Sequence, residues 1–151
     1  MDAEKFTKKS LEVIESCEKL AYEYNNQELT QAHLMYALVT VEDSLVAKLL
    51  TNMEINMEAF KGECEKLVTN RPKVSGGQLF TSPEFSKALI QAEKEAKQMG
   101  DDYISVEHIF LGLLEKADKD IKRVINAYGI TRGKFLEVLA NIRGNRKVES
   151  D

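Results

Sequence analysis

Proline and glycine are scarce in this sequence, with two prolines and eight glycines among 151 residues. Both residue types interrupt helices, so their scarcity permits long helical segments. No segment alternates apolar and polar residues between turn signals, which is the pattern of a half-buried strand. Apolar residues recur instead at three- or four-residue intervals, as in Leu45, Leu49 and Met53. The sequence therefore predicts an all-α fold.

Cysteine is also scarce. Cys17 and Cys64 lack the CxxC spacing of redox and metal motifs and stand among helix-forming residues, which favours two buried, reduced thiols. The N-terminus, MDAEKFTKKS, has no apolar signal-peptide core. No apolar run approaches the ~20 residues of a membrane span. These absences predict a cytoplasmic protein. The formal net charge of −4, spread along the chain, argues against nucleic acid and anionic membranes as partners.

Motifs for catalysis or cofactor binding are absent. The chain has no GxxxxGK[ST] phosphate loop and no GxSxG nucleophile motif. Asp118 resembles the first position of a calcium loop, but Arg123 and Gly129 stand where a glycine and a glutamate are needed. His33 and His108 have no second ligand at metal spacing. We therefore expect a non-catalytic chain without a metal ion or cofactor.

An internal repeat organises the chain. Thr30 and His33 recur as Ser105 and His108, and we call the separation between Thr30 and Ser105 the repeat offset. The same offset relates Ala21 to Ala96, Leu38 to Leu113, Phe60 to Phe135 and Arg71 to Arg146. Such regular self-similarity indicates a tandem duplication, with two four-helix units related by a pseudo-twofold axis. The predicted domain covers 1–143, as repeat one (1–69), a bridge (70–82) and repeat two (83–143), and 144–151 begin a linker. The predicted helices are 7–24, 31–41, 44–53, 57–69, 83–99, 106–116, 119–128 and 132–143.

Matched residues in the two repeats are suited to the starts of helices. Thr30 and Ser105 are predicted N-caps, and Thr7 and Ser82 have the same role at the start of each repeat. Asn56 and Thr131 are predicted to cap the last helix of each unit. The two histidines, at the third helical position, are expected to bond a backbone group near the helix start. Gly112, in the place of Ala37, predicts a close helix crossing.

The repeats also differ. Asp101 replaces Asn26, Glu107 replaces Ala32, and Tyr103 stands where repeat one has Glu28. A carboxylate in the first helical turn is explained by the helix dipole, at about 0.3–1 kcal/mol, whereas two acids beside an aromatic residue also suit a binding surface. Both interpretations stay open from the residues alone.

Four segments carry a family resemblance: Phe6-Thr7, NRPKVSGGQLFTSP, GDDYISVEHIFLGLLE and IRGNRKVESD. Together they resemble the N-terminal domains of ClpB-type protein disaggregases, within the Clp N-domain group of AAA+ unfoldases. The resemblance implies an all-α pseudo-dimer of four-helix repeats, monomeric when isolated and tethered to a hexameric ATPase ring. It also implies that ATP and magnesium belong to ATPase modules beyond Asp151, and that this domain engages unfolded or aggregated proteins.

The resemblance also implies a site. Thr7, Asp101 and Glu107 match a threonine and two acids tied to substrate handling in the family. We expect them to line the seam between the repeats, with Leu89, Tyr103 and Ile109 as an apolar floor and Asp101 facing solvent. Gln91, Glu95 and His108 are more polar than the family often shows at groove-like positions. The alternative function is docking of a folded adaptor, as in protease-linked ClpA- and ClpC-like unfoldases. A co-chaperone system or an adaptor is a further partner that the resemblance implies.

Overall fold

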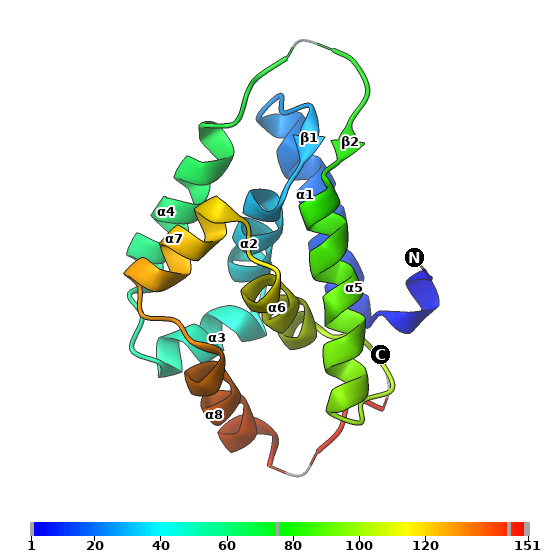
Figure 1. Cartoon of the computed structure of the whole chain (residues 1–151), viewed down its shortest axis with the longest axis vertical. Helices are drawn as coiled ribbons and strands as arrows, with labels where there is room; N and C mark the ends of the chain where they lie inside the picture. The colour runs from blue at the N-terminus through cyan, green and yellow to red at the C-terminus, as the bar shows by residue number, and fades with distance from the viewer. Residues whose placement is uncertain (1, 75, 145, 150–151) are drawn as a thin grey trace.

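A computed structural model of the chain describes residues 2–74, 76–144 and 146–149. The described residues are mostly helical, which confirms the predicted all-α fold (Figure 1). Each helix lies within about one residue of its predicted bounds. The elements are η1 (Ala3–Lys5), α1 (Lys8–Glu23), β1 (Glu28–Leu29), α2 (Gln31–Thr40), α3 (Leu45–Asn52), α4 (Met57–Thr69), β2 (Phe80–Thr81), α5 (Pro83–Gln98), α6 (Val106–Glu115), α7 (Lys119–Ala127) and α8 (Arg132–Arg143).

Side-chain caps explain why the helices begin where they do. The Thr7 hydroxyl accepts a hydrogen bond from the Ser10 amide at 3.2 Å, and Ser82 and Thr131 accept corresponding bonds at 3.1 and 3.2 Å. Each bond satisfies an amide that has no partner inside its own helix. Asp118 also serves as a cap, because its carboxylate accepts from the Ile121 amide at 3.0 Å. The acid that resembled the start of a calcium loop therefore begins α7.

Helices α2 and α6 lie at the centre, surrounded by the other helices (Figure 1). In α6 the eight consecutive residues from Val106 to Leu113 are all buried. A helix buried on every side must be packed by both repeats at once. An aromatic contact also spans the repeats: the rings of Phe60 on α4 and Tyr128, directly after α7, meet edge to face, with centroids 5.1 Å apart. The two units share a single apolar core.

Helices α5 and α6 cross so closely that a side chain would not fit at Gly112. A Cβ atom built there would lie 2.3 Å from the carbonyl oxygen of Ala88 and 3.0 Å from the amide nitrogen of Ala92. These neighbours are backbone atoms of α5, so they cannot rotate away. The predicted close crossing is confirmed for this pair of helices.

The two repeats also exchange backbone pairings that the sequence did not predict. Leu29 pairs with Thr81 in the short parallel sheet β1–β2, and Phe6 pairs with Ile104 in a parallel bridge. Thr81 is the repeat counterpart of Phe6, and Ile104 is the counterpart of Leu29. Each repeat therefore pairs the segment before its first helix with the segment before the other repeat's second helix. A twofold axis would produce this reciprocity, and superposition of residues 6–69 on 81–144 remains the direct test of it.

Candidate functional site

The histidines extend the helix caps in both repeats. In repeat one, Nδ1 of His33 accepts a hydrogen bond from the Thr30 amide at 3.0 Å, and Nε2 donates to Oδ1 of Asn26 at 2.9 Å. In repeat two, Nδ1 of His108 accepts from the Ser105 amide at 2.9 Å, and Nε2 faces Oδ2 of Asp101 at 2.7 Å. Because a backbone N–H donates to Nδ1, each ring is neutral and carries its proton on Nε2. The predicted structural role of the histidines is confirmed.

Burial opposes protonation of both rings. It lowers the pKa of His33 to about 4, with the positive charge of Arg71 acting in the same direction. Burial also lowers the pKa of His108, although the nearby carboxylates of Glu107 and Asp101 favour the charged ring. Both imidazoles are therefore neutral, hydrogen-bonded parts of the core at neutral pH.

The two acids peculiar to repeat two surround one arginine. Nη1 of Arg143 lies 2.7 Å from Oδ2 of Asp101, and Nη2 lies 2.9 Å from Oε2 of Glu107. The Ser105 hydroxyl donates to the second oxygen of Glu107. The side chains of Asp101, Glu107 and Arg143 are only 0%, 5% and 11% exposed. We call these three residues, with His108, the ion cluster.

The expectation that Asp101 faces solvent is therefore wrong. Its partner Arg143 follows 42 residues later, at the end of α8, and no local pattern indicated that the chain returns there. Burial alone would raise the pKa of Asp101, but hydrogen bonds from the Val148 amide, Arg143 and His108 outweigh this effect and hold the pKa below its usual value. The carboxylate stays charged inside the protein because these donors replace water.

Asp101 also holds the residues that follow α8. Its Oδ1 accepts from the Val148 amide at 2.9 Å, and the Val148 carbonyl accepts from the Asp102 and Tyr103 amides at 2.8 and 3.3 Å. Of the predicted linker 144–151, the structure describes Gly144, which caps α8, and residues 146–149, which pack on repeat two. We call residues 146–149 the exit segment. Positions 145, 150 and 151 of that linker lie outside the described residues.

The bridge occupies the matching place in repeat one. Lys73, the repeat counterpart of Val148, pairs with Asn26 in an antiparallel bridge. The Asn26 amide group, however, points its nitrogen at the Pro72 carbonyl, at 3.4 Å. In repeat one, the Asn26 amide thus faces a backbone carbonyl, that of Pro72. In repeat two, the Asp101 carboxylate faces a backbone N–H, that of Val148. This difference explains why repeat two has an acid at a position where repeat one has an amide.

Thr7 contacts the segment that joins Asp101 to α6. Its amide donates to the Ile104 carbonyl at 3.0 Å, and the same carbonyl accepts from the Ser10 hydroxyl at 2.9 Å. Tyr103, which precedes Ile104, is half-buried, and Thr7 is 8% exposed. Thr7 thus contacts the backbone next to Tyr103, while Asp101 and Glu107 meet at Arg143. We call Thr7, Asp101, Tyr103 and Glu107 the Thr7 corner, and their joint role in binding stays a prediction. Ser10 and Arg143 complete the arrangement, and the sequence analysis identified neither.

The predicted apolar floor is largely closed. Leu89 and Ile109 are 7% and 0% exposed and belong to the core between α5 and α6. The expectation that Ile109 is open to a client is therefore wrong, because α6 is enclosed on all sides. The unexpectedly polar Glu95 is also buried, where it accepts from Arg132 at 3.0 Å and from Gln91 at 2.9 Å. Its charge is balanced inside the protein.

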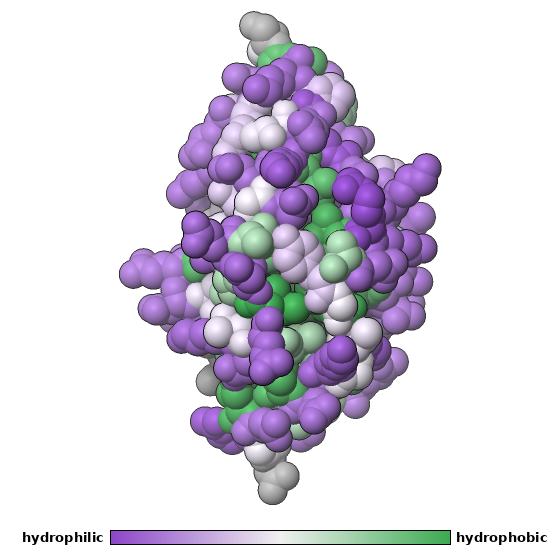
Figure 2. Space-filling model, turned by 90° about the vertical axis from the view of Figure 1, so that its left-hand side faces the viewer, coloured by the Kyte–Doolittle hydropathy of each residue, from purple (hydrophilic) through white to green (hydrophobic). Residues whose placement is uncertain are grey.

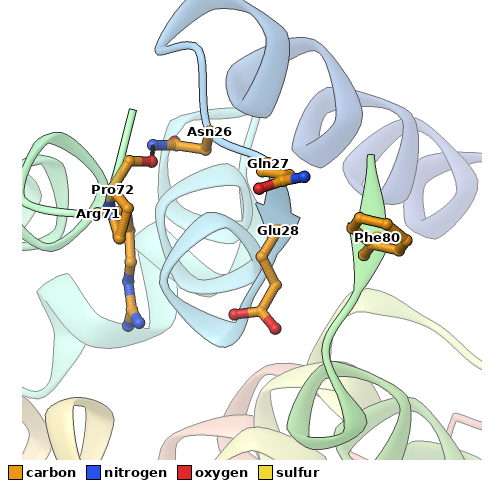
Figure 3. A pocket seen from close by; sticks show the side chains of 6 residues that line it. All are labelled: Asn26, Gln27, Glu28, Arg71, Pro72 and Phe80. Atoms are coloured by element: carbon orange, nitrogen blue, oxygen red, sulfur yellow. Dashed lines mark hydrogen bonds between the residues drawn. The ribbon is translucent and has the colours of Figure 1, made fainter. Parts of the chain in front are cut away.

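Accessible apolar surface is found instead at the matching corner of repeat one. A cavity of about 350 Å³ lies between β1, β2 and the start of the bridge (Figure 3). Phe80 borders it and is 54% exposed, and Glu28 and Arg71 place opposite charges on its walls. At the Thr7 corner a smaller hollow of about 180 Å³ is bordered by Lys5, Asp101 and Asp102, among others. Each corner thus combines an aromatic residue with charged groups.

Two further surveys concern the described part of the chain only. Among residues 2–74, 76–144 and 146–149, no three His, Cys, Asp or Glu side chains are grouped as a metal site requires. Within the same ranges no helix has both the length and the apolar character needed to cross a bilayer.

With this geometry established, the chain can be assigned to a family. Residues 5–128 match the Clp repeat (R) N-terminal domain, and the chain belongs to this family. It is 37% identical to the chaperone protein ClpB of Clostridium tetani and 38% identical to that of Nitratidesulfovibrio vulgaris (strain Hildenborough). Both matches cover 99% of this chain and 18% of the relative's length. The predicted resemblance to the N-terminal domain of ClpB-type proteins is confirmed.

Solved structures show the same fold. The Hsp104 N-terminal domain from Candida albicans superposes with a TM-score of 0.84 over 97% of this chain and 96% of that one, at 21% identity. The N-terminal domain of the chaperone ClpD from Arabidopsis thaliana gives a TM-score of 0.69 over 92% of this chain and 98% of that one, at 19% identity. The helical arrangement is therefore that of a Clp N-terminal domain.

Proposed function

We propose that this chain is a non-catalytic substrate-binding module of a protein disaggregase. It engages unfolded or aggregated polypeptides and presents them to an ATPase ring, whose ATP and magnesium are bound elsewhere in the larger protein. The chain spans only 18% of the length of its ClpB relatives, so the ring and its activity are part of the proposal. The proposal is supported by the family and by the meeting of distant residues at the Thr7 corner.

In this proposal the four residues of the corner have different roles. Tyr103 is half-buried and Asp102 is exposed, so both are accessible to a client. Tyr103 packs against an apolar side chain of the client. The small exposed part of Thr7 contacts the client's backbone. Asp101 and Glu107 act indirectly, since Arg143 occupies their carboxylates and they hold the loop that carries Tyr103. Leu89 and Ile109 are buried in the core and have no direct contact with the client in this proposal.

A pair of matched substitutions tests the proposal. Tyr103→Ala removes the accessible aromatic group, and Glu28→Ala changes the corresponding position of repeat one. Fluorescence anisotropy measures binding of a labelled, reduced and alkylated protein that cannot fold. We expect Tyr103→Ala to weaken binding about fivefold, the equivalent of about 1 kcal/mol, and Glu28→Ala to leave it unchanged.

Unchanged affinity of Tyr103→Ala, with normal helicity by circular dichroism, would refute the assignment of the client site to this corner. The adaptor-docking alternative predicts the opposite binding preference for the wild-type chain. It requires tight binding of a folded partner and no measurable binding of the unfolded protein.

A further inference from the structure

A second pocket lies between the end of α5, α8 and the exit segment. Its volume is about 420 Å³, within the range of sites that bind small ligands or a few peptide side chains. We call it the α8 pocket. In Figure 1 the last turn of α5, α8 and the C-terminal segment all lie at the lower end of the molecule. The lining of this pocket includes Met99, Leu136, Leu139, Arg143, Arg146 and Lys147.

One side of the α8 pocket is apolar. Leu136 and Leu139 face it from α8, and Met99 faces it from the end of α5. Leu139 is only 1% exposed, whereas Leu136 and Met99 are partly exposed and pack against the core. On the face shown in Figure 2, hydrophobic surface also appears near the lower end of the molecule, within a mostly hydrophilic surround. A partner's apolar side chain would cover surface that water now contacts.

The rim of the α8 pocket is cationic. The charge of Arg143 is balanced by Asp101 and Glu107, but Arg146 and Lys147 bond to backbone carbonyls. Arg146 donates to the Ile142 carbonyl at 2.7 Å, and Nζ of Lys147 donates to the Met99 carbonyl at 2.7 Å. Among the described residues, neither forms an ion pair with a carboxylate. Two positive charges thus border an apolar pocket on a chain whose net charge is −4.

We propose that the α8 pocket binds a short segment of a partner protein in which an acidic residue stands beside large apolar ones. The apolar side chains pack on Met99 and Leu136, and the carboxylate reaches Arg146 or Lys147, whose remaining N–H groups are available as donors. A purely apolar segment would leave both charges unused, and a basic one would be repelled. The charge and the apolar floor together favour an acidic, apolar occupant.

The occupant would also stabilise the docked exit segment. Arg146 and Lys147 belong to that segment, which is held in place by the bond between the Val148 amide and Asp101. The pocket is complete only while the segment is docked. A ligand that binds only the docked form must favour it, by linkage. Binding at the α8 pocket is therefore coupled to the ion cluster through Val148.

The test uses the 151-residue chain and a fluorescein-labelled ten-residue peptide in which Asp alternates with Leu and Phe. Fluorescence anisotropy compares the wild type with the double variant Arg146→Glu/Lys147→Glu. The control Lys61→Glu/Lys66→Glu makes the same charge change on α4. We expect the first double variant to weaken binding at least tenfold and the control to stay within twofold. A peptide with Lys in place of Asp should not bind. Tyr103→Ala should leave this binding unchanged, so failure here is distinguishable from failure of the proposed function.

A second pair of variants, at Val148, tests docking of the exit segment without changing any side chain that lines the α8 pocket. Val148→Pro removes the N–H that bonds Asp101, whereas Val148→Ala retains it. We expect a several-fold loss of peptide affinity with proline only. The proposal is overturned if the acidic and basic peptides bind equally, or if the charge reversal at Arg146 and Lys147 has no effect. Binding of laurate without binding of the peptide would also overturn it, since the pocket would then take a lipid anion.

Discussion

Replacing Arg143 with methionine should destabilise the fold far more than its position near the end of the last helix suggests. Its guanidinium bonds to Asp101 at 2.7 Å and to Glu107 at 2.9 Å, and both carboxylates are almost fully buried. Removing one partner of a buried ion pair typically costs about 3–5 kcal/mol, because the remaining charge is left without compensation. His108, Val148 and Ser105 still bond to the acids, so we expect a value near the lower end, about 3 kcal/mol.

Urea unfolding at pH 7, followed by circular dichroism, measures this loss. For a chain of this size, about 3 kcal/mol corresponds to a decrease in Tm of roughly 6–12 °C. Glu107→Ala combined with Arg143→Met should recover part of the loss, since it removes one of the two uncompensated charges. Repeat one supports this expectation, because it has Ala32 and Val68 at these positions and both are buried there.

The pH dependence of the Arg143→Met effect distinguishes a loss of charge compensation from a loss of packing. In the wild type, Arg143 helps to hold the folded-state pKa of Asp101 below its usual value, so wild-type stability falls as the pH drops and the unfolded chain takes up the proton first. Without the arginine, burial of Asp101 is less opposed and its folded-state pKa is higher than in the wild type, so the variant loses less stability over the same range. The stability difference between Arg143→Met and wild type should therefore shrink as the pH falls from 7 towards 4. A difference below about 1 kcal/mol at pH 7, or one that does not change with pH, would refute the reasoning that these charges are compensated by Arg143.

Two further predictions follow from the core and the caps. Gly112→Ala should destabilise the chain by about 1–3 kcal/mol through overpacking against the α5 backbone, whereas Gly62→Ala in α4, where the added Cβ meets nothing within 4 Å, should be neutral or stabilising. Thermal unfolding of both variants tests this, and equal effects would exclude the close crossing as the cause. His33→Gln should flatten the pH dependence of stability, because glutamine at this position can keep the capping box. The pKa of His33 is lowered to about 4 in the fold, so the unfolded chain protonates first and wild-type stability falls as the pH drops from about 6.5 to 4. Identical slopes for His33→Gln and wild type in urea titrations would show that this ring does not contribute.

The helices and their starting points were predictable because the signals for them are local. A cap such as Thr131 acts on an amide three residues away, and apolar periodicity acts within a few turns. The internal sequence repeat strengthened these signals, since each predicted cap had a counterpart at the matching position of the other repeat. The close crossing at Gly112 was predictable for the same reason, as repeat one has the small residue Ala37 in its place.

The candidate site was only partly predictable. The comparison of repeats singled out Asp101 and Glu107, but it predicted a solvent-facing acid where the structure has a buried one. Exposure depends on what the rest of the chain places over a residue, and Arg143 and Val148 lie far from Asp101 in sequence. The sequence likewise predicts Leu89 and Ile109 to be accessible, because it does not show that helices of both repeats enclose α6.

The sequence by itself determined the all-α class and the helix boundaries, because propensity, capping and periodicity act over distances of a few residues, and its internal repeat predicted two four-helix units. Only the tertiary structure decided that Phe6 pairs with Ile104 while Leu29 pairs with Thr81, and that one arginine neutralises two acids. These contacts join segments far apart in the chain, and their formation depends on which backbone donors and acceptors the fold brings face to face. The matching positions Asn26 and Asp101 show this dependence. The amide of Asn26 meets the Pro72 carbonyl, whereas the carboxylate of Asp101 meets the Val148 N–H.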